Sequence, residues 1–156
     1  MTRRRAWTAA ALAGALVVLA SACAPDDRVT LDDLGAADLA GLNGPTMSEH
    51  CDEIPHPDLS RSSTCGRGPT TGEANVPLTP GDYAVVLFCV PPGSYRLEAT
   101  RPADAFDAIE VDCSDGDDPA ISPRFTVPEG GVESMHETFD GEGRSMTMLF
   151  SVPDGV

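Results

Sequence analysis

The sequence has no lysine and few aromatic residues. Its ten basic residues are all arginine and stand against 25 Asp and Glu, so the net charge at neutral pH is −15. A surface so acidic repels polyanions, which excludes nucleic acids and disfavours anionic lipid headgroups as partners. Trp7 is the only tryptophan, and Tyr83 and Tyr95 are the only tyrosines. This shortage disfavours a sugar-binding protein that stacks its ligand on exposed aromatic rings.

The motifs that usually carry catalysis are also missing. The sequence has no G-x-S-x-G elbow, no H-E-x-x-H helix and no phosphate-binding glycine loop. Any carboxylate pair chosen for glycoside hydrolysis would be arbitrary among so many acidic residues. His136, close to Glu133 and Glu137, fits a surface loop better than a general base. We therefore expect a protein that is not an enzyme.

No apolar run is long enough to cross a membrane as a helix. The longest, residues 9–20, has about a dozen residues, whereas a bilayer core of roughly 30 Å needs about 20. This run follows a basic head, Arg3-Arg4-Arg5, and precedes small residues, which is typical of a secretory signal. We predict a signal peptide over residues 1–22.

The residues Leu19-Ala20-Ser21-Ala22-Cys23 resemble the bacterial lipobox, in which a diacylglyceryl group is attached to the cysteine before cleavage. The resemblance implies a lipid anchor on Cys23 that holds the mature protein on the outer face of the cell membrane. Ala20 stands where the motif usually has leucine, and Ala20-Ser21-Ala22 also suits an ordinary signal peptidase, which would release a secreted protein. Either cleavage removes three arginines and takes the net charge to −18.

Residues 23–45 are acidic and rich in small side chains. We interpret them as a lipid-anchored acidic tether that holds the domain off the membrane. The alternative is a short docked helix that begins near Thr30 and gathers Leu31, Leu34 and Leu42 on one side.

The folded domain is predicted to span residues 46–156, with a proline-rich, loop-rich part at 46–81 and a strand-rich part at 82–156. Tyr83–Val90 is apolar on both faces, as is typical of an inner strand that is covered on both sides. Further strands are expected near Val76–Leu78 and at Tyr95–Thr100, Asp107–Cys113, Phe125–Val127 and Ser145–Val152. These six or seven short strands predict an all-β fold, a Greek-key or immunoglobulin-like β-sandwich. The pattern is similar to that of small cystine-containing sandwich lipoproteins of unassigned role.

Four cysteines remain once Cys23 is set aside, and in an exported chain they are expected to form two disulfides. Of the three possible pairings we prefer Cys51–Cys65, which orders a proline-rich loop, and Cys89–Cys113, which joins core strands. The second pairing favours a three-residue loop after Cys89 or a crossing to the other sheet over a two-residue loop. Either places Cys89 with Tyr95 and Leu97, and a cystine belongs on an apolar face. Each disulfide is expected to contribute about 3 kcal/mol.

Two groups of side chains have metal-binding chemistry. Histidines beside the first cysteine loop suit zinc or copper, and clustered carboxylates at a sheet edge suit calcium. The residues are His50 and His56 in the first group, and Asp112, Asp115, Asp117 and Asp118 in the second. The alternative interpretations are solvated histidines and an ordinary acidic turn, and we expect no cofactor.

The sequence therefore predicts an exported envelope protein that acts as a non-catalytic binding module. Its expected partners are the membrane, through the lipid on Cys23, and an unknown envelope protein or other envelope component. A metal-handling surface lipoprotein that uses copper, zinc or calcium is the alternative function, and a secreted protein is the alternative location.

Overall fold

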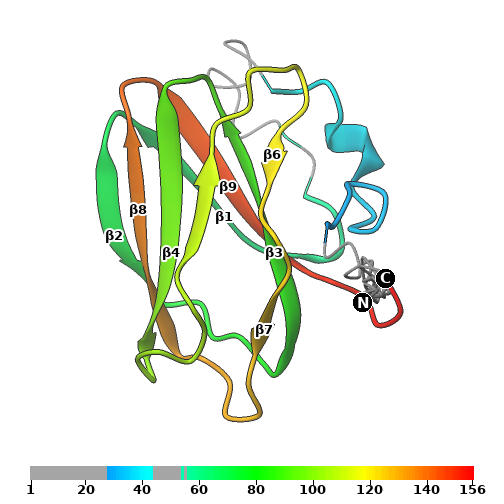
Figure 1. Ribbon diagram of the computed structural model, residues 1–156, viewed down its shortest axis with the longest axis vertical. Helices are drawn as coiled ribbons and strands as arrows, with labels where there is room; N and C mark the ends of the chain where they lie inside the picture. The colour runs from blue at the N-terminus through cyan, green and yellow to red at the C-terminus, as the bar shows by residue number, and fades with distance from the viewer. Residues whose placement is uncertain (1–27, 44–53, 55) are drawn as a thin grey trace, which may run out of the picture.

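The computed structural model describes residues 28–43, 54 and 56–156 of the chain. Within these residues the backbone forms nine β-strands and one short 3-10 helix (Figure 1). The elements are η1 (Ala37–Leu39), β1 (Ser60–Arg67), β2 (Thr70–Ala74), β3 (Gly81–Cys89), β4 (Gly93–Arg101), β5 (Ile109–Asp112), β6 (Ala120–Ile121), β7 (Phe125–Val127), β8 (Ser134–Gly141) and β9 (Arg144–Ser151). No helix in these ranges is long and apolar enough to span a bilayer. The predicted signal peptide and Cys23 lie outside the described residues.

The strands form two antiparallel sheets that pack face to face (Figure 1). Sheet I has the order β1-β9-β3-β6, with β7 also paired to β3, and sheet II has the order β2-β8-β4-β5. The chain changes sheet six times, between β1 and β2, β2 and β3, β3 and β4, β5 and β6, β7 and β8, and β8 and β9, so neighbouring strands are mostly distant in the sequence. The predicted all-β sandwich is confirmed, although the described residues hold nine strands and not six or seven.

Strand β3 is buried on both faces from Tyr83 to Cys89. Its alternate side chains belong to two hydrophobic cores, one between the sheets and one on the outer face of sheet I. The inter-sheet core takes Tyr83, Val85, Leu87 and Cys89, and the outer core takes Ala84, Val86 and Phe88. A strand that is apolar on both faces is stabilised only when both faces are covered. The prediction of an inner strand is therefore confirmed.

A disulfide joins the two sheets at one end of the sandwich. Cys89, the last residue of β3, is bonded to Cys113, which directly follows β5, and their Cα atoms are 5.3 Å apart. The predicted pairing is present, and so is the predicted crossing to the other sheet after Cys89. Cys65 is also disulfide-bonded. Its predicted partner Cys51 lies outside the described residues, so that pairing stays a prediction.

Residues 28–43 pack on the outer face of sheet I and complete the outer core there (Figure 1). Leu34 and Leu39 are fully buried in this core, together with the outward side chains of β3 and β9. The tether predicted over residues 23–45 is therefore wrong for residues 28–43, which belong to the folded domain. The physical reason is that β3 and β9 both present apolar side chains on this face, and an apolar face has to be covered.

Local hydrogen bonds shape this packed segment. The Thr30 N–H donates to Asp33 Oδ2 at 2.8 Å, and the Asp33 N–H donates to Thr30 Oγ1 at 3.3 Å. These reciprocal bonds cap a single turn. The Thr30 hydroxyl also donates to Asp33 Oδ2 at 2.6 Å, and this bond, together with the one from the Thr30 N–H, holds the pKa of the Asp33 carboxyl below its usual range. The turn ends at Gly35, whose φ of +59° suits glycine, and the Ala36 N–H closes it by donating to the Leu31 carbonyl at 2.8 Å. The alternative interpretation was a docked helix that begins near Thr30. The structure has a capped turn at this point and not a longer helix.

The part predicted to be loop-rich, residues 46–81, contains two strands. β1 is built mainly from Ser, Thr and Arg, and β2 has the sequence Thr-Thr-Gly-Glu-Ala. Each lies at the edge of its sheet, pairs with one neighbour and is largely exposed. The hydrophobic pattern does not reveal such strands, because an edge strand that faces water needs no apolar side.

Candidate functional site

Strand β8 places a carboxylate between the two sheets. Met135, Glu137 and Phe139 alternate along the strand on its inward face, and Met135 and Phe139 are buried in the inter-sheet core. Glu137 is half-buried and pairs in register with Gly72 of β2 and Leu97 of β4. A carboxylate at a core position is unusual, because removing a charge from water is costly unless the charge is paired.

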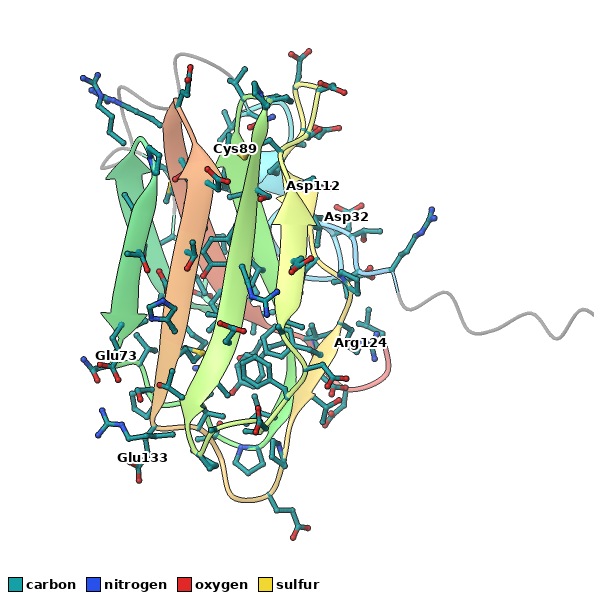
Figure 2. All side chains as sticks on the ribbon, turned by 60° about the vertical axis from the view of Figure 1, so that its left-hand side comes forward. Asp32, Glu73, Cys89, Asp112, Arg124 and Glu133 are labelled. Carbon is teal, nitrogen blue, oxygen red and sulfur yellow. A yellow bond between two sulfur atoms is a disulfide. The ribbon has the colours of Figure 1, made fainter. Side chains whose placement is uncertain are left out.

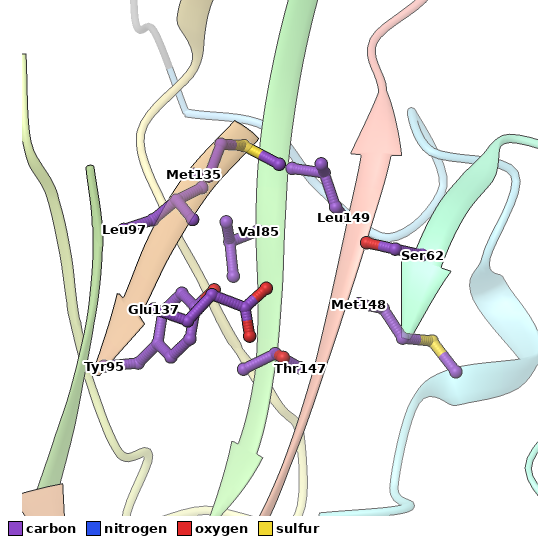
Figure 3. Close-up of a pocket in the computed structure, with 9 residues that line it drawn as sticks. All are labelled: Ser62, Val85, Tyr95, Leu97, Met135, Glu137, Thr147, Met148 and Leu149. Carbon is purple, nitrogen blue, oxygen red and sulfur yellow. The ribbon is translucent and has the colours of Figure 1, made fainter. Parts of the chain in front are cut away.

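Hydroxyl groups surround this carboxylate (Figure 3). The side chains of Tyr95 and Thr64 hydrogen-bond to Glu137, and Thr147 hydrogen-bonds to Tyr95. Figure 3 shows Tyr95 and Thr147 next to Glu137. Tyr95 and Thr147 are buried, whereas Thr64 is exposed at the edge of sheet I. We call Glu137, Tyr95, Thr147 and Thr64 the inter-sheet polar site. It draws one residue from each of four strands, β8, β4, β9 and β1.

The surroundings of Glu137 raise the pKa of its carboxyl group. Burial raises the pKa of Glu137, and the hydrogen bonds with Thr64 and Tyr95 offset part of that increase. Burial also raises the pKa of Tyr95, and the nearby Glu137 charge adds to the increase. In the part of the chain that the structure describes, no basic side chain contributes to the pKa of Glu137. The carboxylate is therefore stabilised by hydroxyl groups alone.

A small cavity adjoins the inter-sheet polar site. Its volume is about 10 Å³, which is room for about one water molecule. Tyr95 and Glu137 supply its polar wall, while Val85, Leu97 and Leu149 supply apolar wall (Figure 3). A cavity with this lining accepts a small polar group and excludes a large one.

Small, exposed residues of the edge strands β1 and β2 stand in register with the inter-sheet polar site. Thr64 of β1 pairs in register with Thr147, and Gly72 of β2 pairs with Glu137. Thr64 and Gly72 are both exposed, and a side chain added at Gly72 would meet no atom within 4 Å. There is therefore open space next to Gly72, the residue of β2 that pairs with Glu137.

Replacing Glu137 by glutamine is expected to stabilise the protein at neutral pH by about 1 kcal/mol, because the amide keeps hydrogen bonds and carries no charge to desolvate. Folding raises the pKa of Glu137, so the stability linked to this group is complete below the ordinary glutamate pKa of 4.5 and is lost as the pH rises through the folded value. Urea unfolding from pH 4 to pH 8 should show the Glu137→Gln advantage growing with pH.

Glu98→Gln is the matched control for this measurement. Glu98 is a surface carboxylate whose pKa is lowered by its hydrogen bond to Arg96. Its contribution to stability is present at neutral pH and is lost on acidification, so the sign of the pH dependence is opposite. A Glu137→Gln variant that is equally or less stable than the wild type at pH 8 would contradict the burial of a charged carboxylate.

The outer face of sheet II is a second candidate surface. We define it by Glu73, Arg96, Glu98, Glu110, Asp112 and His136, and Figure 2 turns it toward the viewer with Glu73 and Asp112 at opposite edges. Arg96 donates to Glu98 at 2.6 Å and also to Glu110, so its charge is occupied by carboxylates of its own face. His136 lies on this face, where its Nε2 is 3.0 Å from Thr71 Oγ1. It belongs to a strand and not to the surface loop that the sequence predicted.

The predicted calcium residues do not form a metal site. Asp112 lies at the end of β5, and Asp115, Asp117 and Asp118 lie in the loop that follows. Among the described residues no three Asp, Glu, His or Cys side chains are grouped to hold a metal ion, which contradicts the calcium prediction. His56 is exposed, and its predicted companion His50 lies outside the described residues, so the histidine pair stays a prediction.

The acidic loop instead holds the packed segment through Asn43, which is buried. Asn43 Nδ2 donates to the carbonyl oxygens of Ser114 at 3.3 Å and Gly116 at 2.9 Å, and its Oδ1 accepts the Cys89 N–H at 3.0 Å. The Asn43 N–H donates to the Asp117 carbonyl at 2.8 Å. The loop also holds the segment through the Asp118 carboxylate, whose Oδ1 accepts the Gly41 N–H at 2.8 Å. Asn43 was not predicted from the sequence because its partners are distant in the chain.

Glu137 was missed for a different reason. It lies next to His136, which was predicted to be in a surface loop. However, Met135-x-Glu137-x-Phe139 has the period-2 alternation of a half-buried strand. That alternation places Glu137 on the apolar face and is the signal that would have identified it. Tyr83 and Tyr95 are both buried, so neither offers a sugar-binding platform.

No protein-family model, curated protein sequence or solved structure matches this chain.

Proposed function

We propose that this protein is an exported, lipid-anchored binding module of the bacterial envelope, with no catalytic activity, and that its partner docks on the outer face of sheet II. The observation that carries the docking surface is the asymmetry of the two sheets. The outer face of sheet I is covered by residues 28–43, whereas the side chains that define the outer face of sheet II are polar or charged and at least partly exposed. The lipid anchor is supported by the lipobox-like residues that end at Cys23.

Charge indicates the kind of partner. Glu73, Glu98, Glu110 and Asp112 lie on this face, and the guanidinium of Arg96 is already paired with two of them. The rest of the domain is also acidic, so the field outside this face attracts cations over a Debye length of about 8 Å at physiological salt. We therefore propose a protein partner with a basic docking surface, whose association rate falls as salt is raised.

Charge reversal on the face tests the docking surface. Glu73→Arg with Asp112→Arg changes two exposed edge positions, and Asp32→Arg with Asp38→Arg makes the same change of charge on the exposed side of the segment that covers sheet I. Each tagged, full-length protein is cross-linked in its own cells, and the cross-linked residues are mapped by mass spectrometry. Cross-links from the outer face to a basic partner should fall at least tenfold in the first variant and persist in the control. Equal cross-linking in both would overturn the docking surface.

The anchor has its own test. Native mass spectrometry of the protein, extracted gently from its cells, should show acyl mass on Cys23 and the loss of four hydrogens for two disulfides. An unacylated chain that begins at Cys23 would contradict the lipid anchor and would leave the docking proposal untouched, since the two concern different residues.

A further inference from the structure

The inter-sheet polar site contains a charge whose partner is missing from the described chain. Glu137 occupies an inward position between Met135 and Phe139, and its hydrogen-bond partners are the hydroxyl groups of Thr64 and Tyr95. A partly buried carboxylate costs free energy when no cation is paired with it. Placing a cation next to Glu137 would recover that free energy, which makes the site a candidate for binding one.

The cavity limits the size of such a cation. Its volume of about 10 Å³ accommodates one water molecule or a group of similar size. An ammonium group is compact, whereas a guanidinium is planar and larger and a trimethylammonium group is bulkier still.

The hydrogen-bonding groups also match an ammonium group. A primary ammonium has three N–H donors and no acceptor. The Glu137 carboxylate and the hydroxyl oxygens of Tyr95 and Thr147 are acceptors, and all three side chains line the cavity. A divalent metal ion needs more ligands than this, and the described residues contain no group of three metal-binding side chains.

The geometry points to a site for a primary ammonium group, which enters between β1 and β2 and pairs with Glu137. This route is favoured because Thr64 and Gly72 are exposed and because no atom lies within 4 Å of where a side chain at Gly72 would begin. The chain has no lysine, so no side chain of its own supplies this group. Its source is a lysine of another protein or a small free amine, and the site does not depend on the outer face of sheet II.

Titration of the full-length protein with n-butylammonium tests the site, followed through the carboxyl ¹³C signal of Glu137 by NMR. We expect a saturable shift of that signal with n-butylammonium, and no saturable shift with tetramethylammonium or n-butylguanidinium at the same ionic strength. In a second arm the probe is acetyl-Gly-Lys-Gly-amide, with acetyl-Gly-Arg-Gly-amide as its control. Binding of the lysine peptide at least tenfold tighter than n-butylammonium would assign the source to a protein lysine, and comparable binding would assign it to primary amines in general.

Glu137→Gln provides the matched loss of function, because this variant is expected to stay folded. Backbone amide signals near the cavity should shift saturably with n-butylammonium in the wild type and in Glu98→Gln, and the apparent affinity should fall at least tenfold in Glu137→Gln. The proposal is overturned if no amine gives a saturable shift, so that the cavity holds an ordered water only, or if tetramethylammonium gives the same shift as n-butylammonium.

Discussion

Replacing both Leu34 and Leu39 by alanine is expected to lower the free energy of unfolding by about 5 kcal/mol. Both side chains are fully buried in the outer core of sheet I. Single Leu→Ala changes at such sites cost about 2 to 5 kcal/mol each, and two changes in one core are not fully additive. Because a domain is stable by only about 5 to 15 kcal/mol in total, the double variant should be close to unfolding at 37 °C.

Urea unfolding followed by circular dichroism measures this loss. The control is Asp38→Ala, an exposed change between the two leucines, which should change the unfolding free energy by less than about 0.5 kcal/mol. If the double variant unfolds at the same urea concentration as the wild type, residues 28–43 do not contribute to the core and the tether interpretation is restored for them.

Replacing Asn43 by alanine is expected to cost about 3 kcal/mol. The change removes the acceptor of the buried Cys89 N–H and both donors to the acidic loop, and each buried group left without a partner costs about 1 to 3 kcal/mol. Amide hydrogen exchange should report the loss of the acceptor of the Cys89 N–H. The Cys89 amide should exchange much faster in Asn43→Ala, whereas amides at the opposite end of β3 should be less affected.

Asn43→Asp separates the two halves of this network. The aspartate keeps an acceptor for the Cys89 N–H but turns an oxygen toward the carbonyl oxygens of Ser114 and Gly116, and like partial charges repel. This variant should be less stable than the wild type at neutral pH and should recover part of the loss on acidification, as the protonated carboxyl regains one donor. Wild-type stability at neutral pH would contradict the role assigned to the amide.

The sequence located the inner strand because its composition is extreme. Tyr83–Cys89 is continuously apolar, which is compatible with a strand buried on two sides. The Cys89–Cys113 pairing was preferred because it joins core strands, and it favoured a crossing to the other sheet after Cys89, since a cystine belongs on an apolar face. These inferences were confirmed because burying apolar side chains is favourable, and an apolar run can be identified within a single segment of the sequence.

The edge strands and Asn43 were not predictable in the same way. The Ser-rich β1 and the short β2 are strands because β9 and β8 offer them unpaired backbone groups, and Asn43 is buried because Ser114, Gly116 and Cys89 meet it in space. Backbone hydrogen bonding between distant segments leaves little trace in the pattern of side chains.

The inter-sheet polar site and the outer face of sheet II could likewise be predicted only in part from the sequence. The acidic composition alone determined that a partner should be basic or neutral, and the period of 2 in Met135-x-Glu137-x-Phe139 already placed a carboxylate on an apolar face. Only the tertiary structure decided that Thr64, Tyr95 and Thr147 lie near that carboxylate and that residues 28–43 cover sheet I. It also decided that, among the described residues, the side chains defining the outer face of sheet II are at least partly exposed. The physical reason is that composition and alternation act within one segment, whereas a site is an arrangement of segments whose contacts form only when the two sheets pack together.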